Sequence, residues 1–225
     1  MIRIHVICEG QTEETFVKEL LAPHFAFMDV YLEPALIGKP GHKGGRVNFD
    51  RLFTDARNRL LGDQTAFCTT FFDFYALPTD FPGKTEASDK PSINDKAMCV
   101  QARLVEALTS KLGDVAMQRF IPYVQMHEYE ALLFSDPARF AEGISRTSLA
   151  PSFQAIRDEF NTPEEINDSP MTAPSKRVQN LAAGYEKPVY GTLAALEIGL
   201  DTIRRECLLF NTWLERIEHL KEEAC

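Results

Sequence analysis

The fold is decided by residues 2–14, which read IRIHVICEGQTEE. The apolar-rich residues 2–8 have the length and composition of a buried β-strand, and Gly10 allows the bend that ends it. Thr12 is suited to cap a helix, which Pro23 would close. Glu9 would then stand at the carboxyl end of a strand, where open α/β sheets bind their ligands. Its carboxylate is either a metal ligand or a solvated loop residue.

The composition is that of a globular protein. The chain has 225 residues, of which 44% are hydrophobic and 25% charged, and a chain of this length can bury an ample core. No window approaches the roughly 18 apolar residues of a membrane helix, and the N-terminus lacks a signal-peptide pattern. The five cysteines are spread without a CxxC pair, which argues against a disulfide framework or a zinc knuckle. We therefore expect a cytoplasmic protein with no membrane association.

The charge restricts the way in which the chain can bind nucleic acid. A net charge of −9 argues against nonspecific coating, which depends on many phosphate contacts. Residues 1–60 hold 8 of the 24 basic side chains but only 8 of the 33 acidic ones, so a local site would draw on this part. The glycine-rich segment 38–46 includes Lys43 and Arg46. It is either a phosphate-contacting loop or a long solvated turn.

Strand and helix patterns alternate in the first part of the chain and only helices follow. Further strands are expected at residues 30–37, 66–72 and 119–125. Helices are expected at residues 49–61, 92–112, 152–160, 176–183, 189–200 and 203–220. Prolines make residues 76–91 irregular, and residues 126–134 suit one or two helical turns. This order predicts an open α/β sheet over residues 1–136, with residues 137–225 as a helical extension packed on it in one structural unit.

Acidic side chains follow three of the four predicted strands. Glu9 and Asp73 come directly after strands, and Glu128 and Glu130 follow the last one. If the strands are parallel, these acids converge at one edge of the sheet. Hard oxygen donors without a His/Cys cluster point to Mg²⁺ or Mn²⁺. Such an ion polarises a phosphoryl oxygen and activates water, as phosphodiester hydrolysis requires.

Each acid also has a simpler interpretation. Glu13 is favoured near a helix N-terminus by the helix dipole alone, and Asp73 can cap a turn. Glu128 and Glu130, two residues apart, cannot share one helix face, so at most one points into the site unless the segment is extended. His127 is either an accessory site residue or an ordinary hydrogen-bonded or exposed histidine.

Four segments of the chain carry a family resemblance: CEGQTE (8–13), FDFYALP (72–78), MHEYEALLFSD (126–136) and PSKR (174–177). With them, the chain resembles the bacterial domain-of-unknown-function family 4276, a Toprim-like group. The Toprim nucleotidyl-transferase/hydrolase domain occurs in topoisomerases, primases and the overcoming-lysogenisation-defect nucleases. The resemblance implies a Toprim-like, mostly parallel four-stranded sheet flanked by helices.

The resemblance also implies roles for individual residues. Glu9 corresponds to the Toprim glutamate, which has acid/base or metal roles, and Asp73 to the first aspartate of the metal-binding DxD motif. Tyr75 stands in place of the second aspartate and is a poor magnesium ligand, although it could hydrogen-bond a phosphate or a metal-bound water. Either Glu13 or Glu128 replaces that ligand, or the site binds one metal instead of two, or it is catalytically inactive.

Lys176 and Arg177 lie in a Pro-Ser-Lys-Arg turn at an expected helix start. They form either a phosphate clamp with the helix N-terminus or an exposed basic turn. The family resembles the nuclease halves of bacterial defence modules, which implies an ABC- or SMC-like ATPase partner. The chain contains no Walker A motif of its own.

The leading hypothesis is a Mg²⁺- or Mn²⁺-dependent nuclease in a defence or DNA-maintenance complex, with DNA rather than RNA as the expected nucleic acid. Its site would consist of Glu9, Asp73, Glu13 and Glu128, with His127, Glu130 and Tyr75 as accessory residues and Lys176, Arg177, Lys43 and Arg46 on phosphates. The alternatives are a catalytically inactive binding or regulatory subunit and an enzyme that hydrolyses nucleotides. Self-association into a homo-oligomer stays open.

Overall fold

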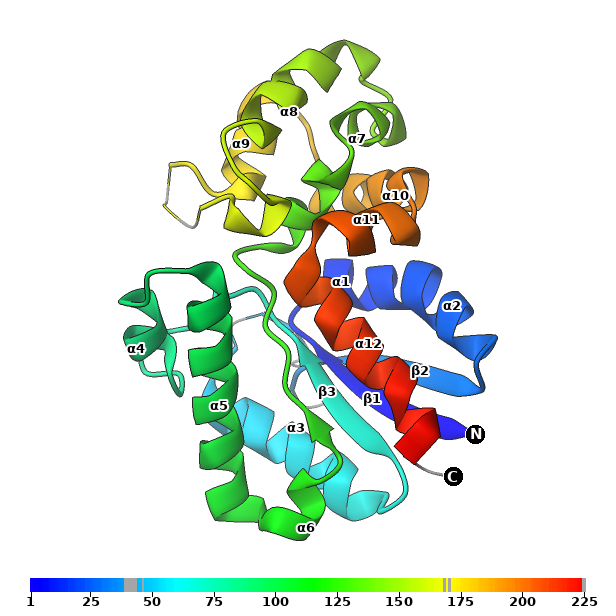
Figure 1. The fold of residues 1–225 in the computed structure, drawn as a ribbon, viewed down its shortest axis with the longest axis vertical. Coiled ribbons are helices and arrows are strands. Elements are labelled where there is room, and N and C mark those ends of the chain that lie inside the picture. Colours follow the sequence, from blue (N-terminus) through cyan, green and yellow to red (C-terminus); the bar gives the residue numbers. More distant parts are fainter. Residues whose placement is uncertain (39–43, 46, 168, 170, 224–225) are drawn as a thin grey trace.

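The protein is built on one parallel sheet. The computed structural model describes residues 1–38, 44–45, 47–167, 169 and 171–223. Its strands are β1 (Ile2–Cys8), β2 (Val30–Leu36), β3 (Phe67–Phe71) and β4 (Phe120–Ile121), in the order β2-β1-β3-β4. Every pair is parallel, and helices flank the sheet (Figure 1). The predicted α/β fold with an open parallel sheet and C-terminal helices is confirmed.

Helices connect the strands and, among the described residues, form all of the regular structure after β4. Up to β4 they are α1 (Gln11–Phe16), the π-helix η1 (Val17–Leu21), α2 (Ala22–Ala26), α3 (Phe49–Gly62), α4 (Lys84–Ser88), α5 (Ile93–Leu112) and α6 (Asp114–Met117). After β4 they are η2 (Tyr129–Ser135), α7 (Pro137–Gly143), η3 (Thr147–Leu149), α8 (Ala150–Arg157), η4 (Pro163–Glu165), α9 (Pro174–Leu181), α10 (Lys187–Ile198), α11 (Leu200–Glu206) and α12 (Leu208–Glu223). Within the described residues, no helix combines the length and the apolar content needed to cross a membrane.

The predictions for residues 76–91 and 203–220 were wrong. Residues 76–91 were expected to be irregular, yet α4 forms between their prolines, after Gly83 turns the chain at φ +80°. Residues 203–220 were expected to be one helix, but the backbone is extended at Cys207 and α12 begins after it. The carboxylate of Glu164 accepts the N–H groups of Leu209 and Phe210, both at 2.9 Å. It thereby satisfies donors that the first turn of a helix leaves without partners.

The fourth strand is shorter than the predicted residues 119–125. Pro122 has no N–H to donate to a strand ladder, and regular pairing stops at Ile121. Threonine side chains of β3 continue the connection: Thr69 Oγ1 donates to the Ile121 carbonyl at 2.6 Å, and Thr70 Oγ1 to the Tyr123 carbonyl at 2.7 Å. The segment therefore still follows β3.

Proline also occurs in the strand at the opposite side of the sheet. In β2, Pro34 lies opposite Val6 of β1. β2 and β4 are the outer strands. Each outer strand thus either contains a proline or is ended by one.

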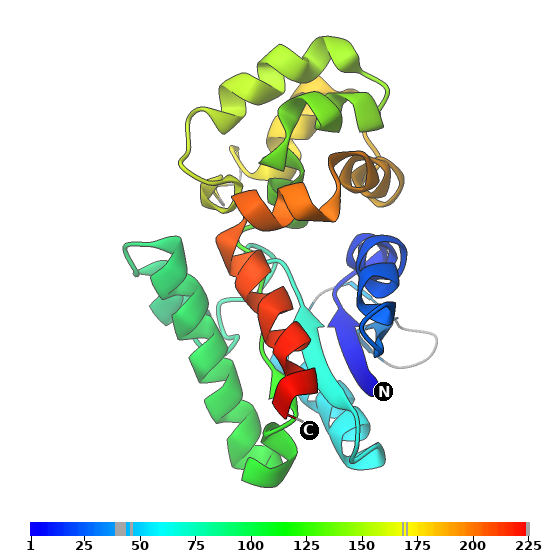
Figure 2. The ribbon, with the colours of Figure 1, turned by 45° about the vertical axis from the view of Figure 1, so that its right-hand side comes forward.

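Two apolar clusters sandwich the sheet. One face packs against α3 and α5, with Ile7, Cys68 and Phe72 among the buried sheet-side residues. The other face packs against η1, α2 and α12. Figure 2 shows α12 lying along the sheet between α5 and the first helices. The second cluster contains residues from both sides of position 136, so the C-terminal helices share a core with the strands.

Trp213 of α12 is a central residue of that shared core. Its ring stacks on Tyr123 with a centroid distance of 4.3 Å and an interplanar angle of 7°. Its Nε1–H donates to Thr69 Oγ1 of β3 at 2.9 Å. A single side chain therefore joins the C-terminal helix to the sheet by both packing and a hydrogen bond.

Helices α7 to α11 lie beyond the carboxyl ends of β1 and β3 (Figure 1). Within this group, α7 crosses α10 closely because Gly143 has no side chain. A Cβ added at Gly143 would lie 2.6 Å from the Ala194 Cα, which is closer than van der Waals contact permits. The packing of α7 on α10 therefore depends on the close approach of the two backbones at Gly143 and Ala194.

We expect Gly143→Ala to lower the free energy of unfolding by about 1–3 kcal/mol, since an overpacked contact between two backbones must shift. Urea denaturation measures the change. Gly62→Ala is the matched control, because Gly62 ends α3 and a Cβ there meets nothing within 4 Å. Equal stabilities of the two variants would contradict the close packing of α7 on α10.

Candidate active site

Glu9 and Asp73 meet at the carboxyl edge of the sheet. Glu9 follows β1 and Asp73 follows the neighbouring strand β3. The backbone N–H of Asp73 donates to Glu9 Oε2 at 3.2 Å. The backbone N–H of Tyr129 donates to Asp73 Oδ1 at 2.8 Å. The structure thus brings together the two acids that were predicted from the strand ends.

Glu13 joins the same site from α1. The predicted helix cap at Thr12 is wrong: α1 begins at Gln11, and Gly10 is the N-cap residue. The Gly10 N–H donates to Glu13 Oε2 at 2.9 Å, which is the bond that the third helical residue makes in a capping box; Gly10 has no side chain to make the other one. Its other oxygen, Oε1, lies 3.7 Å from the Lys187 Nζ.

Glu128 and Glu130 both lie at this edge. The chain is extended at Glu128 (φ −141°, ψ 157°) and turns into η2 one residue later, so the restriction imposed by a helix face does not apply. Glu128 Oε2 accepts the Ser175 N–H at the start of α9, at 2.8 Å. Glu130 is 0% exposed, and its Oε2 lies 3.1 Å from the Lys187 Nζ.

Lys187 lies at the centre of the cluster and was not predicted. It is the first residue of α10, and its Nζ is 3.1 Å from Asp73 Oδ2, 3.1 Å from Glu130 Oε2 and 3.7 Å from Glu13 Oε1. The only sequence signal is Pro188, which favours a helix start at this point. We call Glu9, Glu13, Asp73, Glu130 and Lys187 the acid–lysine cluster.

Burial and mutual repulsion alter the proton affinities of the cluster. Burial, with the charge of Glu13, raises the pKa of Glu9 to about 7. Burial also raises the pKa of Asp73 well above its usual value, although the charge of Lys187 opposes the shift. Burial lowers the proton affinity of Lys187, but the charges of Asp73, Glu130 and Glu13 outweigh it and raise the Lys187 pKa. Glu9 can therefore gain or lose a proton near neutral pH.

We expect the raised pKa of Glu9 to make the metal-free protein less stable as the pH rises. The carboxyl titrates at about 7 in the folded chain and at 4.5 as its ordinary value, so the folded state binds the proton more tightly. Its contribution is complete below pH 4.5 and is lost as the pH rises through 7. The measurement is urea unfolding in EDTA at about pH 5.5 and about pH 8, with a lower free energy of unfolding at the higher pH.

Glu9→Gln should reduce that difference, because the amide does not titrate. The difference should shrink without vanishing, since burial raises the pKa of Glu164 to about 7 as well. An undiminished difference in Glu9→Gln would show that the Glu9 pKa is not raised.

The accessory residues lie around the cluster. Tyr75 is 38% exposed, and its backbone N–H donates to the His127 carbonyl at 3.0 Å. His127 is buried, and its ring makes a T-shaped contact with Phe74. No contact of the described residues joins the Tyr75 hydroxyl to the acid–lysine cluster. The Tyr75 side chain therefore does not lie among the acids of the cluster.

Lys176 and Arg177, two of the predicted phosphate-binding residues, lie outside the cluster. Lys176 is exposed on α9, with its Nζ 3.2 Å from Gln179 Oε1. Arg177 donates to the Thr172 carbonyl at 2.9 Å and pairs with Glu159 at 3.0 Å. These contacts hold the Arg177 guanidinium against Thr172 and Glu159. Lys43 and Arg46 lie outside the described residues.

The donor atoms of the cluster suit a hard cation. Within the described parts of the chain, no group of three or more Asp, Glu, His or Cys side chains is arranged to hold a metal ion; the Lys187 ammonium lies between the carboxylates instead. Carboxylate oxygens are nevertheless the ligands that Mg²⁺ and Mn²⁺ prefer. Glu130 Oε1 is buried and has no hydrogen-bond partner among the described residues. The carboxylate donors of the cluster are therefore of the chemical type that binds a divalent cation, and the Lys187 ammonium lies among these donors.

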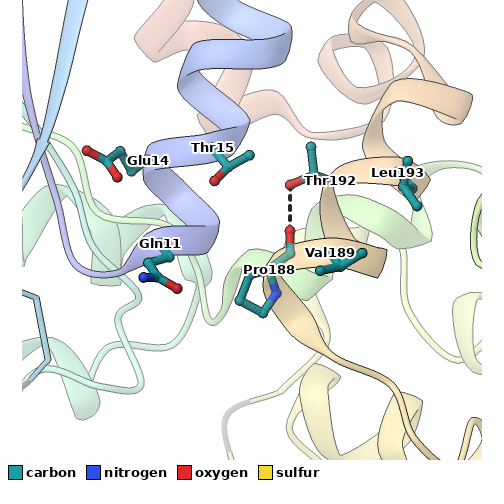
Figure 3. Close-up of a pocket in the computed structure, with 7 residues that line it drawn as sticks. All are labelled: Gln11, Glu14, Thr15, Pro188, Val189, Thr192 and Leu193. Carbon is teal, nitrogen blue, oxygen red and sulfur yellow. Dashed lines mark hydrogen bonds between the residues drawn. The ribbon is translucent and has the colours of Figure 1, made fainter.

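A groove runs beside the cluster between α1 and α10 (Figure 3). It has a volume of about 490 Å³. Its walls are formed by Gln11, Glu14, Thr15, Pro188, Val189, Thr192 and Leu193. The same two helices carry Glu13 and Lys187, although neither of these residues lines the groove.

A family model described as Domain of unknown function (DUF4276) matches residues 8–218. The match confirms the resemblance to that family that the four sequence segments indicated. No curated protein and no solved structure matches the chain. The matched span includes the whole acid–lysine cluster and the helices that flank it.

Proposed function

The chain belongs to the family described as Domain of unknown function (DUF4276), and we propose that it is a divalent-metal-dependent phosphodiesterase that acts on nucleic acid, with DNA as the preferred substrate. The observation that carries this proposal is the meeting of Glu9 and Asp73 at adjacent strand ends, with Glu13 and Glu130 beside them. Four acids at one sheet edge repel one another, and a bound cation offsets this repulsion.

Glu9, Asp73, Glu13 and Glu130 would hold the ion, with Glu128 next to them. A divalent cation supplies a polarised phosphoryl oxygen and a more acidic water molecule. In the metal-free chain, burial raises the pKa of Glu9 to about 7; a bound cation would lower this pKa and keep Glu9 ionised, as a base or a ligand requires. The Asp73 N–H orients the Glu9 carboxylate, and the Tyr129 N–H orients that of Asp73. Backbone groups thus fix the directions of the two principal acids.

We also propose a relation to the Toprim domain. It is supported by a glutamate and an aspartate at the ends of neighbouring parallel strands, in that chain order. Glu13 and Glu130 would take the place of the aspartate that Tyr75 replaces. An ABC- or SMC-like ATPase partner and a role in defence or DNA maintenance are proposed on the resemblance alone.

The experiment that tests the function is incubation of the purified chain with plasmid DNA, single-stranded DNA and RNA. Parallel reactions contain Mn²⁺, Mg²⁺ or EDTA. We expect cleavage of DNA with Mn²⁺ or Mg²⁺ and none with EDTA. Cleavage that EDTA does not inhibit, or the absence of cleavage and of metal binding together, would contradict the proposal.

A catalytically inactive binding subunit is the second candidate. It is favoured by Tyr75, which stands outside the acid–lysine cluster, and by Lys187, which already balances part of its charge. This candidate predicts no heat of Mn²⁺ binding in calorimetry. It also predicts that Glu9→Gln still captures the ATPase partner.

A further inference from the structure

The Lys187 ammonium lies at the point on which the carboxylates converge. Its Nζ is 3.1 Å from Asp73 Oδ2 and from Glu130 Oε2, and 3.7 Å from Glu13 Oε1. These acids come from three separate parts of the chain: the end of β3, η2 and α1. One positive charge is therefore surrounded by oxygen atoms from three sides.

The ammonium group does not satisfy this oxygen set. Glu130 Oε1 is buried and has no hydrogen-bond partner among the described residues. Glu9 adds a further carboxylate beside Asp73, so the acids outnumber the single lysine. A buried carboxylate oxygen without a hydrogen-bond partner is destabilising. The set of acids is thus suited to a cation with a higher charge and more coordination positions than an ammonium group.

Lys187 is attached in a way that allows it to leave. It is the first residue of α10 and follows the N-cap residue Glu186. The side chain is 30% exposed, so its flexible four-carbon stem has a route to solvent. By contrast, Glu9, Glu13 and Asp73 are each held by a backbone N–H group, from Asp73, Gly10 and Tyr129 respectively.

We propose that Lys187 is a built-in substitute for the divalent cation: it occupies the cation position in the metal-free protein and leaves when the ion binds. This inference rests on the proposed function, since it requires the acid–lysine cluster to bind a metal. Its consequence is that the ion has to compete with an ammonium group of the same chain, so that Lys187 weakens metal binding.

Lys187→Met tests this competition and removes the ammonium group while keeping an unbranched side chain. If Lys187 is displaced in about one tenth of the molecules or fewer, its removal should lower the apparent dissociation constant for Mn²⁺ about tenfold or more. Isothermal titration calorimetry measures the constant, and thermal unfolding with Mn²⁺ and with EDTA measures the matching rise in Tm. Lys18→Met is the control, since Lys18 pairs with Glu14 at 3.2 Å outside the cluster.

A second measurement uses the unchanged protein, because Lys187→Met leaves buried acids without a cation and could prevent folding. An amine-reactive acetylating reagent is applied with and without Mn²⁺, and mass spectrometry follows each lysine. We expect Lys187 to react slowly without the metal and several-fold faster with it, while the rate at Lys18 stays constant. A Lys187 rate that does not respond to Mn²⁺ would overturn the inference.

The outcomes separate this inference from the proposed function. If the wild type and Lys187→Met bind Mn²⁺ with equal affinity, the inference is overturned and the metal-dependent function stands. If neither binds Mn²⁺, the function and the inference are both overturned. Tighter binding by Lys187→Met together with faster Lys187 acetylation in Mn²⁺ supports both.

Discussion

Glu9→Gln should lower the kcat of Mn²⁺-dependent DNA cleavage by about 10²- to 10⁴-fold, the range for loss of a positioned acid or base. The amide keeps the size of the side chain and can still accept the Asp73 N–H, which lies 3.2 Å from Glu9 Oε2. It cannot accept a proton and is a weaker ligand for a cation. The measurement is the rate of plasmid cleavage under single-turnover conditions, so that substrate release does not limit the rate.

Glu33→Gln is the matched control for this variant. Glu33 is also an acid of the sheet, on β2, but it pairs with His5 at 3.0 Å and is about half exposed. Cleavage should be unchanged in this control. If Glu9→Gln and Glu33→Gln cleave DNA at the same rate, the site of cleavage is not the acid–lysine cluster.

Trp213→Ala should lower the free energy of unfolding by about 3–5 kcal/mol, the usual range for truncation of a large buried aromatic side chain. The substitution removes the stacking partner of Tyr123 and leaves Thr69 Oγ1 without its indole donor. Because Trp213 joins α12 to β3, the sheet should lose stability together with the helix. Chemical denaturation followed by circular dichroism should therefore show one cooperative transition at a lower midpoint.

Leu208→Ala provides the control for Trp213→Ala. Leu208 is on the same helix and its side chain is 61% exposed, so its truncation should change stability by no more than about 0.5 kcal/mol. If Trp213→Ala left the sheet transition in place and lost only helical signal, the shared core would not act as one unit.

The strand ends were predictable from the sequence because two physical rules determined them. Apolar runs of strand length followed by Glu9 or Asp73 indicate where strands stop, and parallel pairing brings their carboxyl ends together. The structure confirms this convergence through the Asp73 N–H bond to Glu9. The fourth strand was overestimated because Pro122 removes a donor and two threonine hydroxyls substitute for ladder bonds. Hydrogen bonds from side chains that replace backbone ladder bonds follow no periodic pattern in the sequence.

Lys187 could not be predicted in the same way. It is 114 positions from Asp73 in the sequence, and a lone lysine at a helix start is an ordinary solvated residue in most sequences. Only the path of the chain through α9 and α10 returns it to the strand ends. The break at Cys207 was missed for a related reason, since the carboxylate that starts α12 comes from Glu164, more than 40 positions earlier.

The prolines of the two outer strands determine how copies of this chain can associate. An open sheet normally presents unpaired N–H and C=O groups to which a strand of another molecule can add. Here Pro34 interrupts the donor row of β2, and Pro122 ends β4 after two residues. Neither side offers a long uninterrupted template for intermolecular strand pairing or for fibril growth. Assembly by pairing of the outer strands is therefore disfavoured in this protein.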